Sequence, residues 1–348
     1  VLRPYIMNMP LPKLRYSLTL SASILLSSLI DRRIRDYDVN LCHHHPGPWI
    51  GYRAHKKYGT PFVCYVHHPP LFLYPEYMPT GVEWGAEFDR KCIFSIANRR
   101  VPHSLLSSID HISISEADAV IANSKNIANQ IKRIYRRNAI VCYPGVDVNY
   151  FKPLPKKATD YILSKFNLNH PFVLNIGRHV PRKRVDWLLQ IASMVRKEVQ
   201  TTFIIAGETN TYTFTLMKLA KKLGIERDIR FLGEIYSNDL PALYNESNAL
   251  AFTSPNEDFG LAPIEAMACG TPVAAWDDGG PSETVRDGIT GYKVKPYDLE
   301  GFAKTTINLL SDEDLRWKMS QNAVSHVRQH FTWKRHAEIL ERVLRVAG

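Results

Sequence analysis

The sequence predicts an α/β protein with two Rossmann-like domains, each built on a parallel sheet that helices cover on both faces. Short apolar runs rich in β-branched residues recur along the whole chain. Helix-length periodic segments, such as 185–197 and 298–311, separate these runs. Near-continuous apolar strands that alternate with helices are typical of parallel sheets. The length of 348 residues suits two domains better than one simple core.

Ten segments are expected to be strands, four in the first half of the chain and six in the second. They are 38–42, 62–67, 119–124, 140–145, 172–177, 201–207, 229–233, 249–254, 272–276 and 291–294. In open parallel sheets, ligands bind beyond the carboxyl ends of the strands. The residues that directly follow each strand are therefore the first candidates for function, and two facing sheets would present them across one cleft.

The domain boundary is expected in the stretch 143–160, which is rich in proline, polar and turn-forming residues. This linker separates a first domain, 1–150, from a second domain, 151–330. The closing segment, 331–348, reads as one amphipathic helix that can pack on either domain.

Composition excludes several classes of protein. No apolar run reaches the roughly 18 residues that a membrane-spanning helix needs, and the segment 17–30 is short and interrupted by serine. It predicts a packed amphipathic helix. The five cysteines are odd in number and lack C-x-x-C spacing, which favours a reducing compartment and argues against a structural zinc site. With no signal peptide in view, a cytoplasmic protein is expected.

The formal net charge of +10 is uneven along the chain. Residues 1–150 hold 18 Lys and Arg against 11 Asp and Glu, whereas the remainder holds 26 against 23. A basic excess favours phosphate esters, polyanions or an anionic membrane face. The alternative is an ordinary solvated basic surface. No nucleic-acid-binding motif is present, so no nucleic-acid partner is expected.

The segment after the strand 172–177 suggests a diphosphate site. Arg178 and Lys183 lie five residues apart there, and a helix is expected to begin near Val185. Arginine offers a planar fork of donors and lysine a movable point charge, a combination that suits two linked phosphates. The alternative interpretation is a solvated basic loop.

The segment after the strand 249–254 carries two glutamates, Glu257 and Glu265, around an apolar run. Pro263 fits the first turn of a helix that stops near Gly270. The free N–H groups of the residues at the helix start would form a small anion site; these residues are Phe259, Gly260 and Leu261. Because a carboxylate beside a phosphate is repelled, the two glutamates are expected to bind hydroxyl groups on either side of a diphosphate.

Weaker signals follow other strands. Gly279 and Gly280 allow a tight loop before a helix and a second anion contact, and the backbone near Leu232 and Gly233 is suited to read a nucleobase edge. Each pattern alone is common in α/β proteins.

Histidines gather after the first strands, in "HHHPG" (43–47) and "HHPP" (67–70). They lack helical H-x-x-x-H spacing and a neighbouring carboxylate, so no metal site is predicted. His67 is expected to be a hydrogen-bonding or proton-transfer group, with plain loop packing as the alternative.

Four segments together carry a resemblance to a known family. They are "EDFGLAPIEAMACGTPV" (257–273), "GRHVPRK" (177–183), "GGPSETVRDGITGYKV" (279–294) and "VIANSKNIANQIKRIY" (120–135). The set resembles the retaining glycosyltransferases of the GT-B fold, family 4, also called glycosyl transferases group 1. The similarity covers roughly 35–348, and the motifs of the second half are specific as a set.

The resemblance implies a role for each matching residue. Arg178 and Lys183 would neutralise the diphosphate of a nucleotide sugar, and Glu265 would hold its ribose. Glu257 would hold hydroxyls of the transferred sugar in a pocket lined by Phe259, Gly260 and Leu261. Backbone near Leu232 and Gly233 would take the base, and His67 aligns with the histidine that family members place near the sugar. The catalytic residues are thus expected to be Glu257, His67, Arg178 and Lys183.

The resemblance also implies the function. We expect a retaining transfer of a hexose from a nucleoside diphosphate sugar to a glycan or lipid-linked acceptor, with no further cofactor and no metal. "YVHHPP" and "EDFG" are similar to members that use GDP-mannose, while UDP-sugars are common in the family. The aromatic and basic stretch 69–100 suggests contact with an anionic membrane, at the inner face of which the protein would then lie; the alternative is a helix pair packed on the sheet.

Two departures from the family leave alternatives open. The opening strand and its glycine-rich loop are not matched, so the N-terminal segment is expected to be missing, and Asp258 stands where the family usually has glycine. The alternatives are a nucleotide-sugar epimerase or phosphorylase of the same fold, or an inactive nucleotide-sugar-binding protein.

Overall fold

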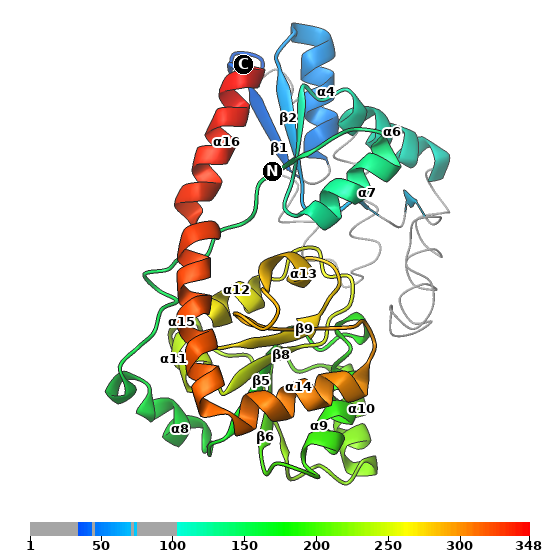
Figure 1. Ribbon diagram of the computed structural model, residues 1–348. Helices are drawn as coiled ribbons and strands as arrows, with labels where there is room; N and C mark the ends of the chain where they lie inside the picture. Colours follow the sequence, from blue (N-terminus) through cyan, green and yellow to red (C-terminus); the bar gives the residue numbers. More distant parts are fainter. Residues whose placement is uncertain (1–33, 44–45, 71–72, 75–102) are drawn as a thin grey trace. The chain divides into compact units, whose positions relative to one another are not determined.

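The computed structural model describes residues 34–43, 46–70, 73–74 and 103–348 (Figure 1). The described chain divides into two compact units. Unit 1 contains the described residues up to Tyr143 together with residues 337–348, and unit 2 contains residues 144–336. Each unit has its own parallel sheet.

The sheet of unit 1 has the strand order β1-β2-β3-β4, and all its pairings are parallel. Its strands are β1 (Asn40–His43), β2 (Phe62–Val66), β3 (Ala119–Ala122) and β4 (Ile140–Val141), and its helices are α4 (Gly47–Tyr58), α6 (His103–Ser115) and α7 (Lys125–Tyr135). The side chain of Ser124 starts α7 by accepting a hydrogen bond from the amide of Ile127 at 3.1 Å.

Both faces of this sheet are buried, as the apolar sequence of β2 requires. Phe62 and Cys64 belong to one cluster with apolar residues of α6 and α7. Val63 and Tyr65 point to the other face, where Val343 of the C-terminal helix α16 (Trp333–Ala347) covers them. The alternation follows from the two-residue period of a strand.

The sheet of unit 2 has the order β10-β9-β8-β5-β6-β7, again with parallel pairings throughout. Its strands are β5 (Phe172–Ile176), β6 (Thr202–Ala206), β7 (Ile229–Gly233), β8 (Ala249–Phe252), β9 (Val273–Trp276) and β10 (Gly291–Val294). The chain runs outward from β5 to β7 and then continues on the opposite side of β5 with β8. The boundary between β5 and β8 is therefore the topological switch point, where open α/β sheets bind ligands.

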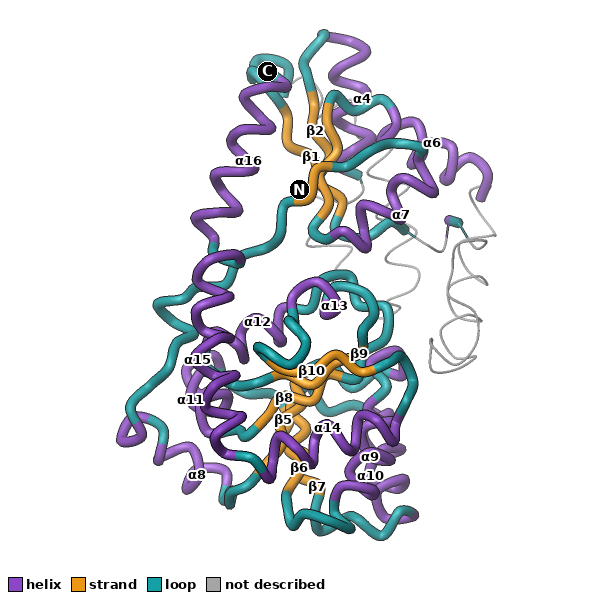
Figure 2. Tube along the Cα trace, in the orientation of Figure 1, coloured by secondary structure: helices purple, strands orange, loops and turns teal. Residues whose placement is uncertain are grey.

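Helices cover both faces of this second sheet (Figures 1 and 2). α9 packs against α10 and α14 on one face, and α12 packs against α11 and α15 on the other. The bounds are α8 (Asp160–Phe166), α9 (Val185–Val195), α10 (Thr211–Lys222), α11 (Leu240–Glu246), α12 (Leu261–Ala268), α13 (Pro281–Thr284), α14 (Leu299–Ser311) and α15 (Glu313–His330), with short 3₁₀ turns at η5 (Lys156–Ala158), η6 (Pro181–Lys183) and η7 (Ser237–Asp239).

The structure confirms the predicted fold class and all ten predicted strands, whose ends shift by no more than four residues. The predicted helix at 17–30 and most of the stretch 69–100 lie outside the described residues. Within the described part of the chain, no helix is both long and apolar enough to span a bilayer.

Candidate active site

Two loops meet at the switch point of the sheet in unit 2. The loop after β5 carries Lys183, the loop after β8 carries Glu257, and Nζ of Lys183 lies 2.5 Å from Oε2 of Glu257. The two side chains are only 17% and 18% exposed. The fold therefore joins two predicted site residues that are 74 positions apart in the sequence.

The position of Lys183 depends on the residue that follows it. Arg184 adopts a left-handed backbone conformation with φ of 50° between the 3₁₀ turn η6 and α9. Such a conformation costs a non-glycine residue about 1–2 kcal/mol. Its guanidinium offsets this by pairing with Asp186 at 2.7 Å and by lying 3.8 Å from the centre of the Trp187 ring. The contacts of Arg184 with Asp186 and Trp187 thus stabilise the turn that carries Lys183.

Glu257 is ionised in this environment. Burial raises its pKa, but the charge of Lys183 and hydrogen bonds from Lys183 and Ser254 lower it, and the net pKa lies below the ordinary value. The Ser254 hydroxyl donates to Oε2 of Glu257 at 2.7 Å. A charged, oriented carboxylate of this kind is a good acceptor for sugar hydroxyls.

Asp258 behaves differently from its neighbour. Burial, followed by the negative charge of Glu257, raises the pKa of Asp258 to about 7, although Arg182 and Lys183 lower it. At neutral pH this carboxyl group therefore holds a proton in part of the molecules and is able to donate a hydrogen bond. The sequence marked Asp258 only as a departure from the family pattern.

The glycine pair after β9 packs directly against the loop that carries Glu257. The amide of Gly280 donates to the carbonyl of Glu257 at 2.7 Å. A Cβ atom on Gly280 would come within 2.2 Å of the Phe259 carbonyl oxygen, and one on Gly279 within 2.4 Å of the Glu257 carbonyl oxygen. The interpretation of this pair as a second anion contact is corrected for Gly280, whose amide has an acceptor inside the protein.

The start of α12 is where the sequence predicts an anion site. Gly260 precedes the helix with φ of 85°, Phe259 is buried, and Leu261, the first helical residue, is 49% exposed. The first N–H groups of a helix have no intrahelical acceptor and attract negative charge. Pro263 lies in the first turn, where its missing N–H has no consequence.

Glu265 lies one turn further along α12. It accepts a hydrogen bond from the hydroxyl of Tyr244 to Oε2 at 2.9 Å. Burial raises its pKa, and the hydrogen bond from Tyr244 opposes this shift. Among the residues that the structure describes, this hydrogen bond engages one of its two carboxylate oxygens, Oε2.

The remaining predicted residues of unit 2 also lie at carboxyl ends of strands. Arg178 follows β5, is exposed, and has no ion pair among the residues that the structure describes. Leu232 and Gly233 end β7, and the Gly233 carbonyl accepts a hydrogen bond from the amide of Gly207 at 2.8 Å.

His67 belongs to unit 1, where it follows β2. Its Nε2 lies 3.0 Å from Nδ1 of His43, and its ring stacks on Tyr65 with centroids 4.4 Å apart. The sequence did not predict this histidine pair, although His43 ends β1, His67 follows β2, and the two strands prove to be neighbours. Within the described ranges, no group of three or more His, Cys, Asp or Glu side chains is arranged to hold a metal ion; His44 and His45 lie outside those ranges.

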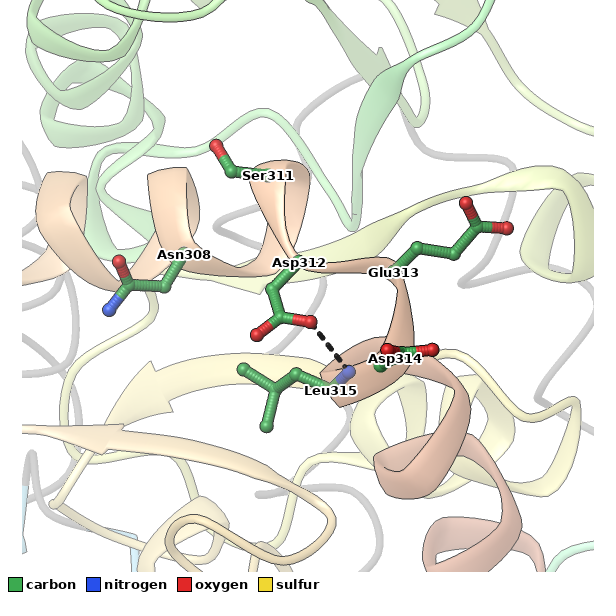
Figure 3. Close-up of a pocket in the computed structure, with 6 residues that line it drawn as sticks. All are labelled: Asn308, Ser311, Asp312, Glu313, Asp314 and Leu315. Atoms are coloured by element: carbon green, nitrogen blue, oxygen red, sulfur yellow. Dashed lines mark hydrogen bonds between the residues drawn. The ribbon is translucent and has the colours of Figure 1, made fainter.

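A cavity of about 640 Å³ lies elsewhere, at the junction of α14 and α15 (Figure 3). Its lining consists of Asn308, Ser311, Asp312, Glu313, Asp314 and Leu315. Asp312 is the N-cap of α15 and accepts a hydrogen bond from the amide of Leu315 at 2.8 Å. This cavity is built from helix ends rather than strand ends, and its acidic residues cap a helix.

Two family models match the chain. Residues 162–326 match the model of glycosyl transferases group 1, and residues 1–150 match the model of glycosyltransferase family 4.

Among curated proteins, the chain is similar to D-inositol 3-phosphate glycosyltransferases. It is 29% identical over 316 residues to that of Salinispora arenicola, which covers 86% of this chain and 66% of the relative. It is 33% identical over 235 residues to that of Nocardia farcinica, which covers 65% of this chain and 52% of the relative. The chain thus spans between about half and two thirds of the length of these relatives.

Solved structures show the same fold. Sucrose-phosphate synthase from Thermosynechococcus elongatus has a TM-score of 0.76 at 21% identity and covers 94% of this chain and 78% of its own. HepE from Anabaena in complex with UDP has a TM-score of 0.76 at 23% identity, and the alignment covers 92% of this chain and 82% of HepE. The chain has two parallel-sheet units, it shares its fold with these structural neighbours, and the two family models match most of its length. It therefore belongs to the family 4, or group 1, glycosyltransferases and has their GT-B fold.

Proposed function

We propose that the protein is a retaining glycosyltransferase that moves a hexose from a nucleoside diphosphate sugar to a glycan or lipid-linked acceptor. The observation that carries this proposal is the contact between Lys183 and Glu257 at the switch point of the second sheet. A cation suited to phosphate and an ionised carboxylate suited to sugar hydroxyls are adjacent there. That is the arrangement that the junction between a diphosphate and its sugar requires.

In this proposal the diphosphate lies between Arg178, Lys183 and the start of α12. Arg178 is exposed and available to a ligand, and the first N–H groups of α12 add uncharged donors. The ribose hydroxyls bind Glu265, whose carboxylate the Tyr244 hydroxyl orients through Oε2. The base lies against the backbone near Leu232 and Gly233 at the end of β7.

The chemical step is dissociation of the sugar from its diphosphate with retention of configuration. Negative charge develops on the leaving diphosphate, and Arg178, Lys183 and the α12 N-terminus stabilise it without large rearrangement. Glu257 orients the sugar through its hydroxyls while the acceptor oxygen attacks on the face from which the diphosphate leaves. His67, which belongs to unit 1, is proposed as a hydrogen-bonding or proton-transfer group on the family resemblance alone.

The donor is proposed as GDP-mannose or a UDP-sugar. The "EDFG" form of the site loop and "YVHHPP" in unit 1 favour GDP-mannose. Structures of HepE, which is similar in fold, contain UDP and UDP-glucose. The glycosyltransferase proposal does not depend on which donor is correct.

The proposal is tested by the thermal stability of the protein with a panel of nucleoside diphosphates and their sugars. One donor class is expected to raise Tm by several degrees, since ligands that bind only the folded state stabilise it. Glu265→Ala and Arg178→Ala should abolish that increase, while the matched exposed variants Glu226→Ala and Arg227→Ala should keep it. If no nucleotide stabilises the wild type, or if all four variants respond equally, the site is wrong.

Transfer itself separates the remaining alternatives. An epimerase releases nucleoside diphosphate and a changed sugar without an acceptor, a phosphorylase requires free phosphate, and a binding protein shows no turnover with any acceptor. Product analysis with labelled donor distinguishes all three from a transferase. Sedimentation with anionic liposomes at low and high salt tests the proposed membrane surface, and binding that salt does not weaken would contradict an electrostatic contact.

A further inference from the structure

The end of α15 contacts the loop that carries Glu257. Phe331, directly after α15, and Phe259, in the loop after β8, are each only 3% exposed, and their ring centroids lie 6.1 Å apart. A contact between two buried aromatic rings contributes about 0.5–1.5 kcal/mol beyond the area that it buries. Phe259 separates Asp258 from the glycine that starts α12, so Phe331 supports the loop at its centre.

A second contact from α15 reaches the loop after β9. Nε2 of His326 lies 3.0 Å from the carbonyl oxygen of Thr284 in α13. Because a carbonyl only accepts, Nε2 carries the proton. The ring of His326 also meets the ring of Phe331 edge-on, with centroids 5.3 Å apart. Burial lowers the pKa of His326, so the neutral ring is favoured.

The two supported loops form one continuous structure. Gly280 precedes α13 and donates its amide to the Glu257 carbonyl, with no room for a side chain against Phe259. A displacement of Phe259 or of α13 therefore has to move the backbone of Glu257. That backbone sets where the Glu257 carboxylate meets Lys183.

The contact of Phe331 and His326 with the loops after β8 and β9, called here the α15 joint, also contacts the segment that enters unit 2. The amide of Val146 donates to the Phe331 carbonyl at 2.9 Å, and Val146 forms a β-bridge with Thr332. A Cβ atom on Gly145 would come within 2.2 Å of the Trp333 amide nitrogen. The chain passes between the units after Tyr143 and after His336, so the joint lies beside both passages.

We propose that Phe331 and His326 are positioning residues for Glu257, and that the joint at the end of α15 holds the loop in the arrangement that orients the transferred sugar. This inference rests on the proposed glycosyltransferase function. Neither residue is proposed to touch the donor. Their effect is therefore expected on turnover of the nucleotide sugar, with little effect on binding of the nucleoside diphosphate alone.

The test compares Phe331→Leu with Phe203→Leu, which removes an equally buried ring from the core on β6. Both variants should lower Tm by similar amounts. Phe331→Leu should also lower kcat about tenfold, since a displacement of about 1 Å in a reacting group costs up to about 100-fold. The Kd for nucleoside diphosphate, measured by calorimetry, should change less than about threefold for either variant. Equal kcat values for the two variants would overturn the inference.

His326 provides an independent pair of variants. Glutamine supplies an N–H donor that is able to reach the Thr284 carbonyl, whereas leucine fills similar space without a donor. His326→Gln should keep kcat within about twofold of wild type, and His326→Leu should lower it several-fold with the same small change in nucleotide Kd. Equal loss in both variants would contradict a role for the hydrogen bond. Failure of the wild type to bind any nucleotide would instead contradict the proposed function.

Discussion

The loop that carries Glu257 and the helix that carries Glu265 each hold one glutamate with little exposure, yet the two pKa values shift in opposite directions. Glu257 is paired with Lys183, and its pKa lies below the ordinary value. Among the residues that the structure describes, the Glu265 carboxylate has one hydrogen-bond partner, the hydroxyl of Tyr244, and its pKa lies above the ordinary value. Burial alone raises a carboxyl pKa; at Glu257 the charge of Lys183 and the hydrogen bonds from Lys183 and Ser254 reverse the shift, whereas the Tyr244 hydrogen bond at Glu265 does not.

The comparison shows how one short segment supplies two kinds of acceptor. The loop carboxylate is charged and held at the switch point by a residue from another strand end. The helix carboxylate is closer to neutral and is oriented by a residue of α11. Single substitutions around the two glutamates should separate these two acceptors, with effects that decrease from the loss of Lys183 to the loss of the Tyr244 hydroxyl.

Removal of the cation from the loop should have the largest effect. Lys183→Met leaves Glu257 as an unpaired buried charge and is expected to lower the free energy of unfolding by about 3–5 kcal/mol. Transfer should fall by at least about 100-fold, because diphosphate stabilisation is lost as well. The matched change Lys56→Met breaks an ion pair whose members are about half exposed, 52% and 46%, and should change the free energy of unfolding little, because exposed ion pairs contribute little to stability. Similar losses in chemical denaturation would contradict the buried pair.

Neutralisation of Asp258 should change the pH dependence of stability. Its pKa is about 7 in the folded protein against 3.8 as the ordinary value. The folded state therefore binds more protons between these values, and wild-type stability should fall as pH rises from about 4 to about 7. Asp258→Asn removes this loss and should be more stable than wild type at pH 8 by up to about 4 kcal/mol, with a smaller difference at pH 5. A difference in Tm that does not vary with pH would argue against the raised pKa.

Neutralisation of Glu257 should separate binding from turnover. Glu257→Gln replaces the ion pair with Lys183 by a weaker neutral contact. The Lys183 ammonium group is then free to bind a phosphate. The affinity for nucleoside diphosphate should rise several-fold, up to about 10-fold or about 1.4 kcal/mol. Turnover of the nucleotide sugar should fall in the same variant. Calorimetry with the nucleoside diphosphate measures the first effect, and an unchanged or weaker affinity would show that Lys183 is not released.

Removal of the hydroxyl beside Glu265 should have the smallest effect. Tyr244→Phe deletes the hydrogen bond that lowers the Glu265 pKa, so that pKa should rise further and the carboxylate should become a weaker acceptor. Nucleotide affinity should fall about three- to fivefold, corresponding to about 1 kcal/mol. The loss should grow as the pH falls, because a further rise of this pKa leaves more of the Glu265 carboxyl group protonated. The control Tyr161→Phe removes a hydrogen bond to Asp239 at 3.2 Å and should leave affinity unchanged at every pH.

Much of the fold follows from local sequence. Strand β7 begins at Ile229 and ends at Gly233, as predicted, because a β-branched and apolar run ends at glycine. Helix α9 begins at the predicted residue, Val185. The candidate site residues of unit 2 were proposed from the same local pattern, since they lie at or after the carboxyl ends of strands and carry a charge or a bare amide.

Other features of the site depend on contacts that no local pattern records. The pKa of Asp258 depends on how deeply its loop is buried and on Arg182 from another strand end. The contact of His43 with His67 requires that β1 and β2 are neighbours. The support of Phe259 by Phe331 joins two segments that no shared motif connects.

By itself, the sequence determined that there would be two parallel sheets, because apolar periodicity is a property of neighbouring residues. It also located the strand ends to within four residues. Only the tertiary structure decided that β8 returns to the side of β5, because strand order depends on the competition of whole elements for the same sheet edge. That order brings Lys183 within 2.5 Å of Glu257, and their charges at that distance give the candidate site its chemistry.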